Sequence, residues 1–283
     1  MHEIPTSIHK MITLRWGHIL DIEKKQGVAF NKKGGCFHII LDQGSVIAKQ
    51  VKTDREYEVY LDYGSFLKQN GIIIPEVYFA KDDWIVLEDI PQPFPKQRWG
   101  VDREQIKTLF NLHSSTWNHK LALTNPYLPT WTKELNQLGS MYFPTETIVL
   151  LDELQLRSKE IFNPVCCISG DPNPTNWGIR NGKELVLYDF GRFGYGTPAI
   201  DLAILMPGVG EDELSIATIY HSLWKEAGIP FPLSVDQLKD QMMIAKIWSI
   251  LDFLVRYARV MDNNSLDHMV LRLCQKIDEV YVC

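Results

Sequence analysis

The chain has 283 residues, of which 45% are hydrophobic and 23% are charged, so it can fold as an ordinary globular protein with two lobes or one large domain. Its formal net charge is −6 and it has no Lys/Arg-rich run, which argues against a nucleic-acid-binding surface. It also lacks a signal-peptide core and an apolar stretch of about 18 residues, and its five cysteines have no zinc-like spacing, which together predict a cytoplasmic protein with reduced thiols and no membrane span.

Residues 1–90 are expected to form a small, β-rich first lobe. The segment from residue 1 to about 25 has a helical pattern. Turn sequences around Gly34 and Gly44 separate the short apolar runs that follow, which predicts a three-stranded meander. A helix is expected next, with Thr53 as its N-cap and Gly71 just past its end. The predicted strands lie at 27–31, 36–42, 46–51, 76–82 and 84–90, and the helix at 53–70.

Residues 91–283 are expected to form a larger, mainly helical lobe, joined to the first by a proline-rich linker at 91–99. Asp102, Ser234 and Ser265 are plausible N-caps of three of its helices, and Gln105 would reach back to the first of these caps. A small β-rich lobe followed by a helical lobe is an α+β architecture. The predicted helices lie at 102–120, 145–162, 211–227, 234–262 and 265–282, and two strands at 165–169 and 184–190.

The densest group of polar residues lies between residues 169 and 190. Asp171 and Asn176 are five residues apart in a loop rich in proline and glycine, and Asp189 follows thirteen residues after Asn176. The Asn181-Gly182 dipeptide between them predicts a tight hairpin that brings the chain back to where it left. The three side chains can therefore meet, although each residue taken alone could serve only a turn or a strand end.

Such a set of residues suits phosphoryl transfer. One carboxylate orients and deprotonates the attacking hydroxyl, while an amide oxygen and a second carboxylate hold the Mg²⁺ that neutralises the phosphate oxygens. Protein-kinase catalytic loops use an Asp, an Asn five residues later, and then an Asp-Phe-Gly, and here Asp189 begins an Asp-Phe-Gly. The pattern therefore favours a kinase-like phosphotransferase.

The segment 169–203 resembles the active-site region of the aminoglycoside phosphotransferase and choline kinase superfamily, which has His-Gly-Asp, four residues, Asn, then an Asp after a hairpin, then Asp-Leu-Ala. The resemblance implies a protein-kinase-like two-lobe fold, with Asp171 as the catalytic base and Asn176 and Asp189 as Mg²⁺ ligands. It also implies that Asp201 braces the catalytic loop, although a helix N-cap is an alternative for this residue. Ser169 departs from the family, because a His usually stands there.

The resemblance extends to the first lobe, where it implies a lysine that contacts the nucleotide phosphates. Lys49 lies on the expected third strand, and Lys52 is its competitor. Glu56 is the expected partner of this lysine on the following helix. Its alternative role is a capping box with Thr53, and Glu58 lies one step off that face.

Two more segments are expected to bind the nucleotide, which is ATP or GTP. The turn that contains Gly34 and Gly35 would cover the phosphates with its backbone N–H groups. The segment Glu88 to Ile90 looks like the family's hinge, whose backbone would bind the edge of the base. Backbone contacts carry little sequence signal, so the choice between ATP and GTP stays open.

The sequence gives weaker indications of the residues that would bind the acceptor. His113 lies on the apolar face of its helix and is interpreted as a core residue. Trp248, Asp252 and Tyr257 could hold a cationic acceptor by cation–π contact and ion pairing, or could serve only helix packing. Phe193 and Tyr195 could lie at a pocket mouth or pack.

The leading hypothesis is therefore a small-molecule kinase that acts as a monomer or homodimer. Acceptors in the family include aminoglycosides, macrolides, choline and related amino alcohols, and sugars. A non-catalytic, kinase-like nucleotide-binding or structural protein is the alternative, and Ser169 is the feature that favours it. A protein kinase is the poorest reading, because only twelve residues separate Asp189 from Asp201 and leave no activation segment.

Overall fold

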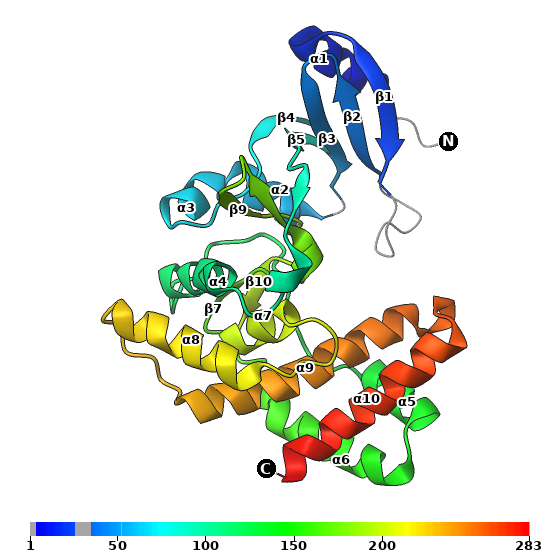
Figure 1. Cartoon of the computed structure of the whole chain (residues 1–283), viewed down its shortest axis with the longest axis vertical. Helices are drawn as coiled ribbons and strands as arrows, with labels where there is room; N and C mark the ends of the chain where they lie inside the picture. Colours follow the sequence, from blue (N-terminus) through cyan, green and yellow to red (C-terminus); the bar gives the residue numbers. More distant parts are fainter. Residues whose placement is uncertain (1–3, 26–34, 52, 283) are drawn as a thin grey trace.

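The computed structural model describes residues 4–25, 35–51 and 53–282. The first lobe is a small antiparallel sheet with three helices, and the second, larger lobe is mainly helical (Figure 1). This arrangement confirms the predicted α+β, two-lobe class. The elements of the first lobe are α1 (Thr6–Trp16), β1 (Ile19–Lys24), β2 (Cys36–Leu41), β3 (Gly44–Gln50), α2 (Asp54–Leu61), α3 (Gly64–Gln69), β4 (Val77–Lys81) and β5 (Trp84–Glu88).

The five strands of the first lobe follow the order β1-β2-β3-β5-β4, and each neighbouring pair is antiparallel. Successive side chains of a strand point to opposite faces. In β3, Val46 and Ala48 pack with α1 in a separate small core, so Ile47 and Lys49 belong to the other face. Ile85 and Leu87 of β5 join the main core, to which α2 and α3 also contribute. Strand alternation therefore directs Lys49 toward α2.

Three expectations for the first lobe need correction or lie outside the described residues. The N-terminal helix ends at Trp16, because Gly17 adopts a φ of 88°, and residues 19–24 form the edge strand β1 instead of a helical turn. The predicted strand at 27–31 lies outside the described residues. The single helix expected over 53–70 is two helices, and the second begins at Gly64, a residue type that weakens a continuous helix interior.

The second lobe is built around α9 (Val235–Tyr257), a helix of 23 residues that contacts α5, α7, α8 and α10. Burial on most of its faces explains why apolar residues run through its whole length. The other elements are β6 (Gln92–Pro93), η1 (Lys96–Arg98), α4 (Arg103–Ser115), α5 (Lys133–Tyr142), α6 (Thr145–Arg157), η2 (Ser158–Glu160), β7 (Cys166–Ile168), η3 (Pro174–Asn176), β8 (Trp177–Arg180), β9 (Glu184–Leu187), β10 (Gly194–Gly196), α7 (Pro198–Leu205), α8 (Glu213–Glu226), η4 (Ala258–Val260) and α10 (Asn263–Val282).

Two of the three predicted caps are present. Asp102 accepts hydrogen bonds from two backbone N–H groups of α4, and Ser234 forms a capping box with Gln237. Ser265 is not a cap, because α10 begins two residues earlier and the Asp262 carboxylate accepts from the Ser265 N–H at 2.9 Å. Gln105 does not reach back either. Its side-chain amide is buried, and no hydrogen-bond partner reaches it within the described part of the chain.

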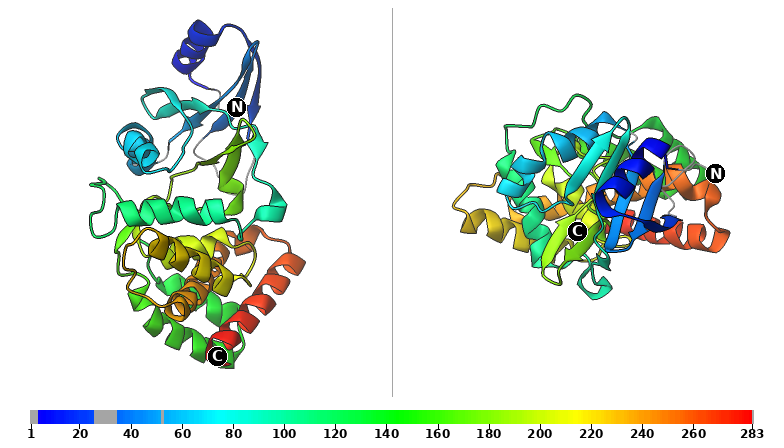
Figure 2. Two further views of the ribbon diagram at one scale, coloured as in Figure 1. Left: turned by 60° about the vertical axis from the view of Figure 1, so that its left-hand side comes forward. Right: turned by 90° about the horizontal axis from the view of Figure 1, so that it is seen from above.

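The hairpin β8–β9 links the two lobes. The Leu187 N–H donates to the Ile73 carbonyl at 2.9 Å, and β6, which lies inside the predicted linker, pairs with β8. Figure 2 shows this hairpin lying against the base of the first lobe. None of the helices in the described residues combines the length and apolarity needed to span a bilayer. Cys166 and Cys167 are free, buried thiols, as expected.

Candidate active site between the lobes

The loop that follows β7 carries the predicted catalytic residue. Gly170 adopts a φ of +75°, and a Cβ at this position would lie 2.0 Å from the Arg192 carbonyl oxygen, so only glycine fits. Asn173 then donates from Nδ2 to Asp171 Oδ1 at 2.9 Å. The same Asn173 accepts the Thr175 N–H at 3.0 Å and so caps the short helix η3. The Asp171 carboxylate is thereby held by a side chain that the loop itself fixes.

Asn176 and Asp189 are brought to this loop as the hairpin signal predicted. Asn181 and Gly182 have positive φ values of 52° and 70°, as the Asn-Gly signal predicted, and the Lys183 N–H donates to the Arg180 carbonyl at 3.1 Å to close the turn between β8 and β9. The Tyr188 N–H donates to the Asn176 carbonyl at 3.0 Å, which places Asp189 beside the catalytic loop. Asp189 itself has a φ of 69°. This backbone conformation is costly for a residue other than glycine, and such conformations are typical of functional sites.

The first lobe contributes Lys49, which contacts two carboxylates. Its Nζ lies 2.5 Å from Glu56 Oε1 and 2.9 Å from Asp189 Oδ1. Burial lowers the pKa of Lys49, but Glu56 and Asp189 outweigh burial and hold this pKa well above its ordinary value. Lys49 therefore stays charged and joins α2 to the catalytic loop region.

The structure distinguishes between the two contacts expected of Glu56. The predicted pair is present, and the competing capping box is not, because the Thr53 side chain makes no cap hydrogen bond. Glu58 points elsewhere and accepts the Thr124 N–H. Lys52 and Gly34 lie outside the described residues, and Gly35 immediately precedes β2.

Asp201, on α7, braces the loop that carries Asp171. Its two carboxylate oxygens accept the backbone N–H groups of Ser169 and Gly170, each at 2.8 Å. His113 Nε2 lies 3.1 Å from Asp201 Oδ2, and its Nδ1 lies 2.9 Å from the Tyr220 hydroxyl. All the atoms of this group are buried. The predicted brace is present, the alternative N-cap role is wrong because α7 begins at Pro198, and His113 is a satisfied core residue.

Ser169 is fully buried, and no hydrogen-bond partner reaches its hydroxyl among the described residues. The loop is held instead through the backbone N–H of this residue by Asp201. Ser169 therefore leaves intact the backbone support that Asp201 gives the loop.

The side chains of Asn176 and Asp189 suit Mg²⁺. The Asn176 Nδ2 donates to the Asp171 carbonyl at 2.8 Å, which leaves the amide oxygen as the free ligand atom. Carboxylate and amide oxygens are the ligands that Mg²⁺ prefers, and this ion usually takes its remaining ligands from waters and phosphates. No cluster of three His, Cys, Asp or Glu side chains forms a metal site in residues 4–25, 35–51 and 53–282.

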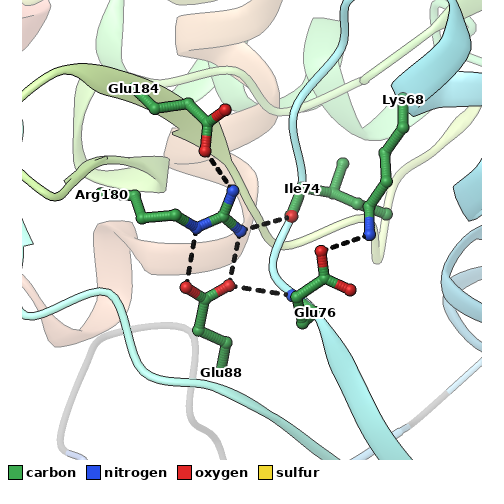
Figure 3. A network of polar contacts seen from close by, with 6 residues as sticks. All are labelled: Lys68, Ile74, Glu76, Glu88, Arg180 and Glu184. Carbon is green, nitrogen blue, oxygen red and sulfur yellow. Dashed lines mark hydrogen bonds and ion pairs between the residues drawn. The ribbon is translucent and has the colours of Figure 1, made fainter.

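The segment that was predicted to be the hinge is held by an ion-pair network that sequence reasoning missed (Figure 3). Arg180 on β8 donates to Glu88 Oε1 at 2.7 Å and to Oε2 at 2.5 Å. The same guanidinium donates to the Ile74 carbonyl at 3.1 Å and to Glu184. The Glu88 side chain thus fastens the end of β5 to the hairpin, while Ile90 lies against Gly178 of β8.

A double-mutant cycle with Arg180→Met and Glu88→Gln should show this coupling in the free energy of unfolding. The two side chains are only 17% exposed, so we expect a coupling energy of about 1.5–3 kcal/mol. The matched control is the cycle of Arg180→Met with Glu184→Gln, whose carboxylate is 45% exposed. That pair should couple by less than about 1 kcal/mol. Equal coupling in the two cycles would contradict the bidentate fastening.

On the acceptor side, most of the proposed pocket residues pack instead. Trp248 is 1% exposed and donates from its indole to the Thr130 carbonyl at 2.9 Å, and Phe193 is fully buried. The Tyr195 hydroxyl donates to the Leu121 carbonyl at 2.5 Å. Asp252 is contacted by Arg192, the arginine of the Asp-Phe-Gly-Arg run, and by Arg256, which sequence reasoning missed.

The fold and the site together define the class: a two-lobe, kinase-like protein with the Asp171 loop and an Asp-Phe-Gly between its lobes. No protein-family model and no curated protein sequence matches the chain. Solved structures match over its whole length. The microcompartment-associated aminopropanol kinase has a TM-score of 0.66 and 13% identity, with 98% of this chain and 97% of that chain covered.

Two further solved structures show the same similarity. The choline kinase of Streptococcus pneumoniae has a TM-score of 0.58 and 13% identity, with 97% of this chain and 100% of that chain covered. The ternary complex of the aminoglycoside phosphotransferase APH(2″)-IIa with streptomycin and ATP has a TM-score of 0.59 and 15% identity, with coverages of 98% and 99%. These matches confirm the resemblance to the aminoglycoside phosphotransferase and choline kinase superfamily at the level of the fold.

Proposed function

We propose that this protein is a kinase that transfers the γ-phosphate of ATP to a hydroxyl group of a small molecule. The observation that carries the proposal is the contact of Lys49 with Asp189 at 2.9 Å, beside a loop that presents Asp171 and Asn176. Residues 1–90 would bind the nucleotide and residues 91–283 the acceptor. The backbone around Glu88 and Ile90 would bind the edge of the base.

Asp171 would act as the general base. Burial raises the pKa of this carboxyl group, while the hydrogen bond from Asn173 and the charge of Arg192 oppose that rise. A half-buried carboxylate held in one position can accept the proton of the acceptor hydroxyl as the oxygen attacks the γ-phosphorus. The bond from this phosphorus to the bridging oxygen of ADP breaks in the same in-line transfer, with no covalent enzyme intermediate.

Asn176 and Asp189 would hold Mg²⁺, which when bound neutralises charge on the phosphate oxygens. Lys49 would lie against the α- and β-phosphates, and Glu56 would keep it in position. Groups that are held in position by such contacts need little reorganisation in the transition state. Nucleotide complexes among the similar structures contain ATP and AMP, which supports ATP over GTP as donor.

Release of nucleoside diphosphate with Mg²⁺ tests the proposal. ATP and GTP would be assayed separately against aminoglycosides, macrolides, choline, ethanolamine, homoserine and sugars. We expect ADP release that depends on both the acceptor and Mg²⁺. Binding of neither nucleotide in the presence of Mg²⁺, measured by calorimetry, would contradict the proposal and favour a structural protein with a kinase-like fold.

A further inference from the structure

A group of three arginines lies on the acceptor side of Asp171, and the proposed chemistry does not use it. Arg192, three residues after Asp189, donates to Asp252 Oδ2 at 3.0 Å. Asp252 and Arg256 both lie on α9, one helical turn apart. Arg256 donates to the same Asp252 oxygen and also to the Asp252 backbone carbonyl at 2.9 Å. One carboxylate therefore serves two guanidinium groups.

The third arginine comes from the first lobe. The Arg55 Cζ atom, on α2, lies 5.9 Å from the centroid of the Tyr127 ring, and the Arg192 Cζ atom lies 5.4 Å from the same centroid. The Arg55 Nη atoms reach the Gly191 carbonyl and Asn125 Oδ1 only at 3.5 Å. Its Nε is buried, and no hydrogen-bond partner reaches this atom within the part of the chain that the structure describes.

The three arginines face two carboxylates: Asp252, which accepts from Arg192 and Arg256, and Asp171, whose charge contributes to raising the pKa of Arg192. Each guanidinium carries five N–H donors and no acceptor, so Asp252 satisfies a minority of those that Arg55, Arg192 and Arg256 bring together. Like charges repel, and the neighbouring Arg192 contributes to lowering the pKa of Arg55, after burial, which is the larger cause. Because Asp252 already contacts two arginines, it is a poor receptor for a cationic acceptor.

A purely structural role explains only part of this arrangement. A cation in the last turn of a helix interacts favourably with the helix dipole, which would account for Arg256 on α9. The helix dipole does not account for Arg192, from the loop after Asp189, or for Arg55, from the first lobe, which both lie over Tyr127. Arginine is the side chain best suited to binding carboxylate and phosphate groups through two parallel hydrogen bonds.

We infer that the acceptor is an anion, a small hydroxyl compound whose carboxylate or phosphate group binds between Arg55, Arg192 and Arg256. This inference rests on the proposed function, because it places the anionic group beside Asp171 and the reacting hydroxyl. It replaces the expectation of a cationic acceptor, and it deepens the proposed function by naming the substrate class.

The test compares probes that differ in one charged group. Glycerate and gluconate carry a carboxylate, glycerol 3-phosphate carries a phosphate, glycerol and sorbitol are neutral, and ethanolamine and choline are cations. Calorimetry with Mg²⁺ and a non-hydrolysable ATP analogue gives each dissociation constant, and ADP release with ATP is measured in parallel. The variants are Arg55→Gln and Arg256→Gln. The matched control is Arg259→Gln, an exposed arginine three residues beyond Arg256.

We expect at least one anionic probe to bind more tightly than its neutral counterpart, and the carboxylate and phosphate arms show which group is preferred. Arg55→Gln and Arg256→Gln should each weaken that binding about 10-fold or more, whereas Arg259→Gln should not. The affinity for the ATP analogue should stay unchanged in all three variants. Thermal unfolding of each variant checks that it is folded.

The inference would be overturned by tighter binding of neutral or cationic probes, by no binding of any anionic probe, or by anion binding that the arginine variants leave unchanged. Weaker binding of the ATP analogue alone would assign the arginines to the donor and would also overturn it. These outcomes are separate from failure of the proposed function. Anion binding without any ADP release would contradict the kinase activity and support the anion site. Phosphorylation of a neutral acceptor would support the kinase activity and contradict the anion site.

Discussion

Asp171→Asn is expected to lower kcat by about 10²–10⁴-fold while leaving the affinity for Mg²⁺ and ATP unchanged. Asparagine has the same shape as aspartate, and it can still receive the hydrogen bond from Asn173. It cannot take the proton of the attacking hydroxyl. Steady-state kinetics with the best acceptor gives kcat, and calorimetry gives the nucleotide affinity.

Asp212→Asn is the matched control for this variant, because Asp212 is exposed and makes no side-chain cap contact with α8. It removes the same charge from the protein and should leave kcat unchanged. An Asp171→Asn variant with wild-type kcat would remove this residue from the chemistry. A loss of nucleotide binding in that variant would instead assign Asp171 to the donor site.

Asp201→Asn is expected to cause the largest loss of stability, about 3–5 kcal/mol in the free energy of unfolding. The wild-type carboxylate is fully buried and accepts from two backbone N–H groups and from His113. An asparagine keeps one acceptor oxygen and turns an NH₂ group toward a donor, so buried N–H groups lose their partner. Urea unfolding followed by circular dichroism measures the change.

The Asp201 variant should also lower kcat, because the loop it braces carries Asp171. His113→Gln serves as the second variant, since it removes one contact of Asp201 and keeps both backbone hydrogen bonds. It should lose less stability than Asp201→Asn. Equal stability of wild type and Asp201→Asn would show that the loop does not depend on this carboxylate.

The local features of the site could be predicted from the sequence, because short-range chemistry fixes them. Asn181-Gly182 specifies the hairpin, and the hairpin returns Asp189 to the loop. The family resemblance implies the pair of Lys49 with Glu56, and strand alternation explains it, because it places Lys49 on the face toward α2. Each of these relations depends on neighbours in the chain, which a sequence pattern can express.

The relations that sequence reasoning missed join distant segments. Glu88 and Arg180 are 92 positions apart, and nothing near either residue indicates the other. The arginine group draws on α2, the loop after Asp189 and the end of α9, so no spacing in the sequence relates its members. The edge strand β1 was missed for another reason: its side chains are almost all exposed, so it lacks the alternation that marks a strand.

Phosphorus NMR of the wild-type protein with Mg²⁺, ATP and an accepted hydroxyl compound follows the transferred group itself. The proposed function predicts a phosphomonoester resonance coupled to the carbinol protons of the acceptor, formed in equal amount with ADP and absent with Asp171→Asn. Inorganic phosphate as the only product, or phosphate bound to the protein, would contradict direct transfer from ATP to a small-molecule hydroxyl.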